Sequence, residues 1–262
     1  MGKEAQIDLS QSLSSSVGLI MKENARLFQL FWENSKLNST NITEFTKRLD
    51  EYNRRESYFP ELQYSRDDLK LKKPGDDLFR QMIGRKSARV FSEKPVNEKK
   101  LGFLMSSFIQ TKDRRRTIAS AGALYPVEVF CLVNNLKGKM NRKIVYYNCD
   151  NHTLSIVCDL PEWKTYKEYF SIDTNSTTPA LIFVFVIFPE RVTDKYGERG
   201  GRFALIEVGH AVQNLALRIA KEQMAGVELG GIYDDRIKDM LKLGGTTAQV
   251  VLGYACGIPG RR

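Results

Sequence analysis

Apolar residues recur at helical spacing in the N-terminal part of the chain, which predicts helices over residues 12–32 and 42–54. A charged stretch with one proline and one glycine follows at residues 65–77 and is typical of a linker. We therefore expect a helical N-terminal arm over residues 1–75, followed by a main domain over residues 76–262.

The main domain mixes helical patterns with short apolar runs that are typical of strands. Helices are predicted at residues 76–84, 97–110, 203–224 and 234–243. Strands are predicted at residues 127–133, 144–147, 154–157, 181–188 and 249–254. Because strands and helices do not alternate strictly, the pattern favours an α+β fold, in which helices flank a mostly antiparallel or mixed central sheet.

Two of these elements carry apolar residues on more than one face. The strand at residues 181–188 reads LIFVFVIF, so we expect a central strand that is covered on both sides. The helix at residues 203–224 is also apolar on more than one face, which predicts a buried central helix. His210 falls within this helix, and we expect it to be a core histidine.

The composition fits one substantial hydrophobic core, because 42% of the 262 residues are hydrophobic. The formal net charge is +9, from 40 Lys and Arg against 31 Asp and Glu. Such a balance suits nucleic acid, an acidic peptide or a phosphorylated cofactor, and equally a basic surface that only keeps the protein soluble. The basic residues form no helix interleaved with aromatics, so nucleic-acid binding is not favoured.

The cysteines and histidines do not favour a metal site. Four cysteines form no Cys-x-x-Cys motif, and the chain has two histidines, so we expect no bound metal. Cys131 and Cys256 lie in apolar runs, where a buried free thiol is the common outcome. The longest apolar run, residues 180–188, is too short to span a bilayer. We expect a reduced, cytoplasmic protein without membrane insertion.

Lys195 and Tyr196 open the stretch KYGERGGRFALIEVGH, which ends at His210. A glycine-bearing turn separates the pair from the predicted central helix. We therefore expect both side chains on a loop at a helix entrance, where backbone N–H groups are free and the helix dipole is positive. A lysine beside a tyrosine can serve as an acid–base pair, and the alternative is a surface pair without a function.

Three further segments suit a phosphorylated, planar ligand. The first is a basic turn whose guanidinium groups and hydroxyl can bind phosphate oxygens, and it comprises Arg85, Lys86, Ser87 and Arg89. The second has small residues that let the backbone approach a flat ligand, and it comprises Ser120, Ala121 and Gly122. The third presents bare backbone N–H groups at Gly230 and Gly231. Taken alone, each segment is better explained as an ordinary turn or loop.

The order of five motifs carries a family resemblance. They are R-K-S-x-R, S-A-G-A-L-Y-P, K-Y-G-x-R-G-x-R, E-x-G-H-x-x-Q-N and a late G-G-x-Y-D-D. Together they resemble the flavin nitroreductase superfamily across residues 76–257, and within it the SagB-type dehydrogenases, which oxidise azoline rings in thiazole/oxazole-modified peptides. The resemblance implies a nitroreductase-like fold and an FMN-binding homodimer with the flavin at the subunit interface.

The resemblance also implies roles for individual residues. Phosphate and ribityl contacts match Arg85, Ser87 and Arg89, with Lys86 standing where the family often has arginine. Contacts to the flavin ring and its reactive edge match Ser120, Ala121, Gly122, Gly230 and Gly231. Arg261 or Arg262 matches a late phosphate contact. Lys195 and Tyr196 match the pair that is regarded as catalytic in azoline oxidation.

Four functions remain open at this stage. The first is oxidation of thiazoline or oxazoline rings in a ribosomal peptide, with a precursor peptide and a cyclodehydratase as partners. The second is reduction of dehydroalanine or dehydrobutyrine in a lanthipeptide, with NAD(P)H as donor and a lanthipeptide synthetase as partner. The third is a general NAD(P)H nitro- or quinone reductase. The fourth is a binding protein that has lost catalysis.

Overall fold

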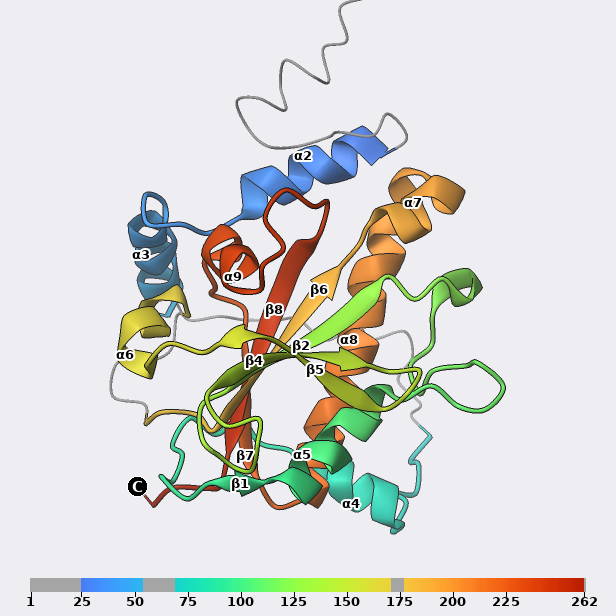
Figure 1. Ribbon diagram of the computed structural model, residues 1–262. Coiled ribbons are helices and arrows are strands. Elements are labelled where there is room, and N and C mark those ends of the chain that lie inside the picture. The colour runs from blue at the N-terminus through green and yellow to red at the C-terminus, as the bar shows by residue number, and fades with distance from the viewer. Residues whose placement is uncertain (1–24, 54–68, 171–176, 262) are drawn as a thin grey trace, which may run out of the picture.

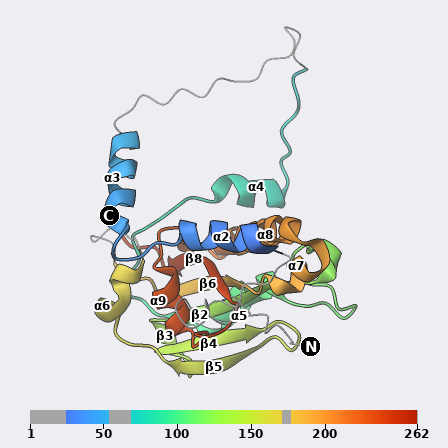
Figure 2. The ribbon, with the colours of Figure 1, turned by 90° about the horizontal axis from the view of Figure 1, so that it is seen from above.

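The computed structural model describes residues 25–53, 69–170 and 177–261. The N-terminal part of the helix predicted at 12–32 and the start of the linker predicted at 65–77 therefore lie outside the described residues. Figure 1 shows one twisted sheet, with the long helix α8 (Glu198–Lys221) running behind it. Seen from above in Figure 2, helix α2 (Arg26–Ser35) lies beside α8.

Six strands form one sheet in the order β5-β4-β2-β6-β8-β7. Their bounds are β2 (Val127–Val133), β4 (Lys143–Asn148), β5 (Thr153–Asp159), β6 (Leu181–Ile187), β7 (Ala225–Leu229) and β8 (Gln249–Gly257). Every neighbouring pair in this sheet is antiparallel. A separate parallel pair joins β1 (Val96–Asn97) to β3 (Leu136–Lys137). The predicted α+β fold with an antiparallel sheet and flanking helices is confirmed.

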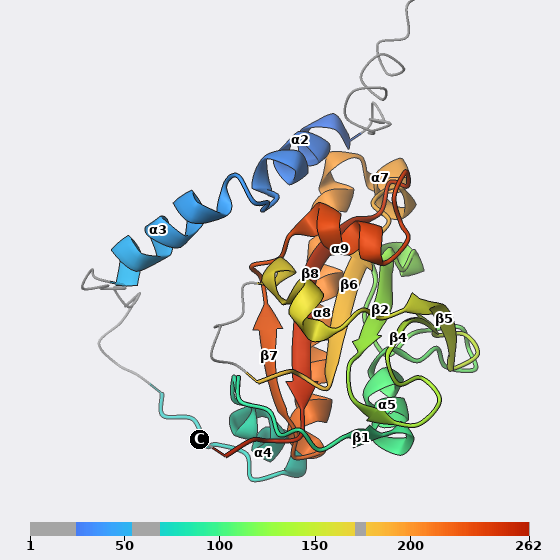
Figure 3. The same cartoon turned by 60° about the vertical axis from the view of Figure 1, so that its left-hand side comes forward.

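Further helices lie around the sheet, except α3 (Ile42–Asn53), which lies away from it (Figure 3). The bounds of the others are α4 (Asp77–Gly84), α5 (Glu98–Met105), α6 (Trp163–Tyr166), α7 (Glu190–Tyr196) and α9 (Asp234–Met240). Short 3-10 turns lie at Ser106–Phe108, Ala121–Ala123 and Lys167–Tyr169. None of the helices in the described part of the chain has the length and apolar character that crossing a bilayer requires.

Strand β6 is the centre of the core, as its sequence predicts. All seven of its residues are buried. Alternate side chains belong to different hydrophobic clusters, with Phe183 and Phe185 facing α8 and Ile182 and Val184 facing the opposite layer. Cys131 and Cys256 are buried free thiols, as expected. The sheet is therefore a middle layer between two apolar cores.

The structure corrects three element boundaries. The central helix α8 begins at Glu198, five residues before the start that the apolar pattern predicts, because its first turn is polar and glycine-rich. A short helix, α7, occupies the segment before it. Residues 225–229, for which the sequence predicted neither a helix nor a strand, form the edge strand β7. This run of five residues contains a glycine and is too short to predict a strand from its sequence.

Helix α2 docks on the start of α8. The Glu198 carboxylate accepts hydrogen bonds from the backbone N–H groups of Leu27 and Phe28, both at 2.8 Å. It therefore caps the first turn of α2, whose N–H groups have no partner within the helix. A Cβ on Gly201 would overlap the Phe28 ring, so the absence of a side chain there makes room for that ring.

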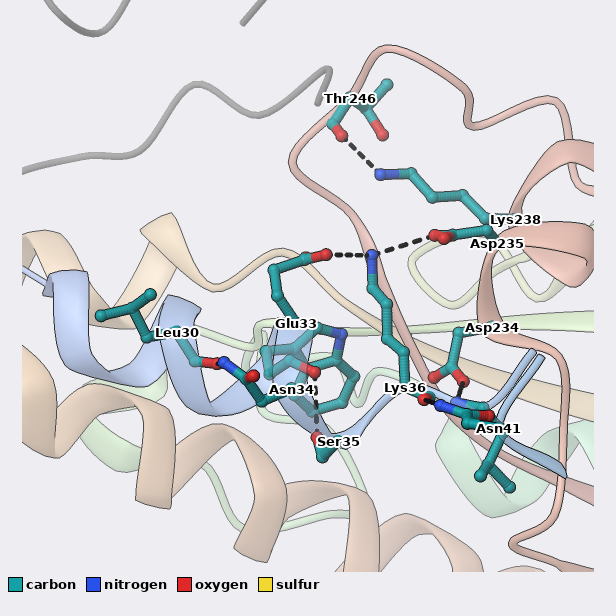
Figure 4. A network of polar contacts seen from close by, with 12 residues as sticks. Leu30, Glu33, Asn34, Ser35, Lys36, Asn41, Asp234, Asp235, Lys238 and Thr246 are labelled. Atoms are coloured by element: carbon teal, nitrogen blue, oxygen red, sulfur yellow. Dashed lines mark hydrogen bonds and ion pairs between the residues drawn. The ribbon is translucent and has the colours of Figure 1, made fainter. Parts of the chain in front are cut away.

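The end of α2 is joined to α9 by a polar network (Figure 4). Lys36 Nζ lies 2.8 Å from Glu33 and 2.9 Å from Asp235. The Leu37 N–H donates to Asp234 at 3.0 Å. Burial raises the pKa of Asp234 to about 6. Figure 3 shows α3 continuing beyond α2, away from the sheet. The domain division at residue 75 stays a prediction.

We expect Gly201→Ala to loosen α2, because the added methyl group displaces the Phe28 ring. Overpacking of this kind costs about 1–3 kcal/mol of unfolding free energy. Amide hydrogen exchange across residues 26–35 should accelerate, and urea unfolding should report the loss of stability.

Gly209→Ala is the matched control for this variant. It lies on the same helix, and nothing stands within 4 Å of the position of its Cβ. Alanine also favours the helix over glycine, so protection of α2 should be retained. Equal exchange of residues 26–35 in the two variants would contradict the Gly201–Phe28 contact.

Candidate active site

Lys195 and Tyr196 are the last two residues of α7, so the expectation that they lie on a loop is wrong. Gly197, with φ 55° and ψ −142°, is the single residue between α7 and α8. Gly200 lets the two helices approach, since a Cβ there would stand 2.7 Å from the Val192 carbonyl. The sequence missed α7 because it is short and mostly polar.

The pair is held in a defined arrangement. The Tyr196 ring packs edge-on against Phe203, with centroids 5.2 Å apart and an interplanar angle of 88°. Lys195 Nζ lies 5.2 Å from the centroid of the Tyr196 ring. Lys195 is exposed, whereas Tyr196 is half-buried. The lysine head is thus open to a ligand, and the tyrosine is oriented by packing.

Gly122 brings the small-residue loop to this pair. A Cβ on Gly122 would stand 2.6 Å from Tyr196 Oη and 2.9 Å from Lys195 Nζ, and the residue has φ +61°. Both the steric space and the left-handed backbone therefore require glycine. The structure thus unites two of the segments that the sequence analysis singled out.

The loop that carries Gly122 is tightly constrained. Ala123 and Tyr125 also have positive φ angles, of 53° and 45°. The Ser120 hydroxyl accepts from the Tyr125 N–H at 2.9 Å, and Arg191 donates to the Tyr125 carbonyl at 2.8 Å. The Arg116 guanidinium lies 4.8 Å from the centroid of the Tyr125 ring. Strained backbone held by its surroundings is a frequent property of functional loops.

Glu207 of α8 is a buried carboxyl next to this loop. It is 2% exposed, and neither carboxylate oxygen has a hydrogen bond of good geometry within the described residues. Burial raises its pKa to about 7, and the neighbouring Ser120 hydroxyl and Arg116 guanidinium oppose the rise. Glu207 opens the E-x-G-H-x-x-Q-N motif, but the sequence assigned it no role of its own, although a glutamate on the apolar face of a helix was a visible signal.

His210 is not a core histidine. It is exposed, and its Nδ1 lies 3.2 Å from the carbonyl oxygen of Ala119. The expectation failed because α8 has a buried stripe and an open face, and His210 lies on the open face. Its ring faces the segment that leads into Ser120.

The basic turn lies elsewhere, at the start of β7. Ser87 pairs with Gly226, and the Ala88 N–H donates to the Gly226 carbonyl at 2.8 Å. Lys86 and Arg89 are exposed and Arg85 is half-buried. None of these three cations forms an ion pair with a carboxylate among the described residues. Their charges are thus available to an anion.

The C-terminal tail joins the same region. Phe91 pairs with Pro259, and the Gly260 N–H donates to the Val90 carbonyl at 3.0 Å. Arg261 follows Gly260 directly, so its backbone lies next to this pairing. Arg262 lies outside the described residues. The structure therefore gathers the basic turn and Arg261 at one place.

Gly230 and Gly231 follow β7 and precede Ile232, which bridges to Phe170. Gly230 is exposed, and nothing lies within 4 Å of the position of its Cβ. No contact among the described residues therefore requires a glycine at that position. A requirement would have to come from a ligand or another chain.

The basic turn and the Lys195–Tyr196 pair lie at opposite ends of β6. Ser87 is joined through Gly226 and Cys256 to Leu181, the first residue of that strand. The pair follows Ile187, the last residue. Six residue steps span about 20 Å along a strand. Within one chain, the basic turn and the Lys195–Tyr196 pair thus form two separate groups, also visible as the separation of α4 from α7 in Figure 1.

The fold and these segments define a nitroreductase-type oxidoreductase. The model of the Nitroreductase family matches residues 82–258, and the chain belongs to this family of flavin oxidoreductases. A protein from Methanocaldococcus jannaschii with a provisional nitroreductase name is 27% identical over 169 residues, which is 62% of this chain and 82% of that protein.

Two solved structures share the fold. A chain of the E. coli microcin synthetase McbBCD complex, with truncated pro-MccB17 bound, superposes with a TM-score of 0.64 at 20% identity and covers 88% of this chain and 86% of that chain. A nitroreductase from Desulfovibrio desulfuricans in complex with FMN has a TM-score of 0.52 at 16% identity, covering 72% of this chain and 89% of that chain.

Glu207 should make stability depend on pH. Its folded pKa of about 7 exceeds the ordinary value of 4.5, so the folded state binds this proton more tightly. Its contribution to folding is complete below pH 4.5 and falls as the pH rises through 7. We expect Glu207→Gln to remove about 3 kcal/mol of that fall, measured by urea unfolding between pH 4 and 8.

Asp234 also lowers the unfolding free energy as the pH rises, both in the unmodified chain and in Glu207→Gln, since its pKa is raised as well. The informative quantity is therefore the difference between the two pH profiles. Glu168→Gln, which changes an exposed carboxyl, serves as the control and should match the unmodified chain. Parallel profiles for the unmodified chain and Glu207→Gln would rule out a perturbed Glu207.

Proposed function

We propose that the protein is an FMN-dependent dehydrogenase that oxidises thiazoline or oxazoline rings in a ribosomally synthesised peptide to thiazoles or oxazoles. The observation that carries this proposal is the contact of Gly122 with Lys195 and Tyr196, since it places an acid–base pair against a loop that suits a flat ligand. Membership of the Nitroreductase family supports flavin redox chemistry on this scaffold.

The basic turn fits the phosphate of FMN. Three arginines lie in this region, namely Arg85, Arg89 and Arg261. None of them forms an ion pair with a carboxylate among the described residues. Guanidinium groups bind phosphate oxygens through paired hydrogen bonds, and the exposed Ser87 hydroxyl can add another. The FMN complex of the Desulfovibrio desulfuricans relative supports the choice of cofactor.

Azoline oxidation removes two hydrogens from the ring, one as a proton and one as a hydride. FMN, when bound, supplies the hydride acceptor. The neutral amine of Lys195 or the phenolate of Tyr196 takes the proton from the ring carbon, and the other group of the pair orients the peptide. Lys195 suits the first role because its head is open to a ligand.

We propose that two copies of the chain complete each site. The basic turn and the Lys195–Tyr196 pair are separated by the length of β6, about 20 Å. A homodimer joins the basic turn, Gly230 and Gly231 of one subunit to the loop and the pair of its partner. This arrangement also gives the open Gly230–Gly231 backbone a ligand to face.

The similarity to a microcin synthetase chain, in a complex with a pro-peptide bound, supports a peptide substrate and a larger assembly with a cyclodehydratase. The Methanocaldococcus jannaschii relative supports the alternative of a general NAD(P)H nitro- or quinone reductase. Reduction of dehydroalanine or dehydrobutyrine in a lanthipeptide remains the other alternative, since the pair can protonate carbon as well as deprotonate it.

We expect Lys195→Ala to slow azoline oxidation by about 10²–10⁴-fold, because it removes the open member of the acid–base pair. Mass spectrometry of a cyclised peptide, incubated with FMN-loaded protein and its cyclodehydratase, measures the loss of two hydrogens per ring. Lys94→Ala, an exposed lysine outside the site, should keep full activity.

No ring oxidation by the unmodified protein under these conditions would exclude the proposed activity. Addition of two hydrogens to a dehydrated peptide in the presence of NADPH would favour the lanthipeptide reductase instead. Fast NADPH oxidation with quinones, unaffected by Lys195→Ala, would favour the general reductase.

We expect Arg89→Ala to weaken FMN binding at least about tenfold, because a charge-assisted hydrogen bond to phosphate is lost. Flavin fluorescence during titration gives the dissociation constant. Arg236→Ala removes an exposed arginine on α9 and should leave the constant unchanged. Equal constants for both variants would place the phosphate away from the basic turn.

A further inference from the structure

A cavity of about 270 Å³ lies between α2 and the body, away from the small-residue loop and the basic turn. Its walls come from α2, the start of α7, α9 and the segment 244–249 that enters β8. The polar contacts of Figure 4, between the end of α2 and α9, form one side of it. The cavity thus exists because α2 covers the body.

Three buried oxygens in this cavity wall lack partners. Gln249 is 7% exposed, and its Oε1 accepts no hydrogen bond from the described residues. Gln29 Oε1 and Glu190 Oε2 are in the same state. Leaving such groups unpaired costs free energy, so buried polar atoms are normally satisfied. Three in one cavity indicate a missing partner.

Glu190 decides the chemistry of that partner. Its Oε1 accepts from the Thr247 hydroxyl at 2.7 Å, while Oε2 is the unpartnered atom. An amide can present either a donor or an acceptor, but an ionised carboxylate only accepts. The missing group is therefore a hydrogen-bond donor, and a cation matches the carboxylate charge.

The lysines of the wall are already engaged. Lys36 is paired with Glu33 and Asp235, and Lys238 Nζ donates to the Thr246 carbonyl at 2.7 Å. The wall holds four acidic and two basic side chains, namely Glu33, Glu190, Asp235, Asp239, Lys36 and Lys238. This acidic balance stands out in a chain of net charge +9 and favours a cationic guest.

The size and lining favour a guest larger than one water molecule or one metal ion. The cavity of about 270 Å³ is several times the volume of a water molecule, about 30 Å³, and lies near the lower limit of ligand pockets, about 300 Å³. Phe28, Ala25 and Pro189 supply apolar wall. A guest with an aliphatic stem and a cationic head matches both surfaces, as a lysine side chain does.

We propose that this cavity binds a lysine side chain of the peptide on which the protein acts, an inference that rests on the proposed function. An ammonium group carries three N–H donors and no acceptor. The number of donors matches the three unpartnered oxygens of the cavity wall. Glu190 opens the same short helix that ends in Lys195 and Tyr196. A peptide anchored here is held against the helix that bears the acid–base pair.

The test is a saturation-transfer NMR titration of the full-length protein with Nα-acetyl-lysine-N-methylamide. We expect binding to this probe and at least tenfold weaker binding to the norleucine analogue, which lacks the ammonium group. Glu190→Gln should weaken lysine binding at least tenfold while its amide oxygen still accepts from Thr247. Gln249→Met, a second variant of similar volume, should weaken it as well.

Glu168→Gln is the matched control, because it changes the net charge equally at an exposed position outside the cavity. Its affinity for the probe should equal that of the unmodified chain. Equal binding of the lysine and norleucine probes overturns the proposal. So does an affinity that Glu190→Gln and Gln249→Met leave unchanged, which would point to an adventitious surface contact.

FMN uptake, measured on the same samples, separates this proposal from the proposed function. Retained FMN binding and ring oxidation without lysine binding would refute the lysine site alone. Lysine binding by a protein that takes up no FMN would refute the flavin function and leave a cation-binding cavity. Loss of FMN in Glu190→Gln would show that the variant perturbs the fold.

Discussion

The junction between α7 and α8 is the constraint on which the rest of the site depends. Gly197 turns the chain within one residue, and Gly200 lets the backbones of the two helices touch. Glu198 and Gly201 then seat the first turn of α2. The buried face of α8 is packed on the sheet. Because the junction fixes the end of α7 against the start of α8, it also fixes where Lys195 and Tyr196 lie relative to the core.

The same junction explains why one segment of sequence serves two purposes. In this segment, Gly200 and Gly201 are structural, because a Cβ there would overlap the Val192 backbone or the Phe28 ring. Its lysine and tyrosine are left at the end of a helix beside Gly122. Residues that pack the helices thus alternate along the chain with the Lys195–Tyr196 pair, so a substitution of the packing residues also displaces the pair.

Much of the fold could be predicted, because burial leaves a strong signal. Strand β6 is apolar on both faces, which predicts a central strand. Asn97 is a common N-cap residue, and its side chain accepts from the Lys100 N–H at the start of α5. Two short elements left no such signal, because α7 is mostly polar and β7 is a run of five residues that contains a glycine. His210 was misplaced because a broad apolar stripe conceals which face of α8 is open.

The site was predictable in its parts and not in their arrangement. Motif order identified the loop and the pair, and their contact through Gly122 follows from folding. Neither spacing nor periodicity shows that the basic turn lies at the far end of β6, because strand pairing decides that distance. The docking of Glu198 on α2, and with it the cavity beneath, depends on contacts between residues about 170 positions apart.

The strand order has a consequence for how the protein is made. Strand β8 lies between β6 and β7, although it comes last in the chain among the strands of this sheet. Until it emerges from the ribosome, the apolar edge of β6 has no partner on one side, and β7 has no place in the sheet. Folding of the sheet therefore has to finish after translation of residue 257, because an apolar strand edge without a partner stays exposed until then.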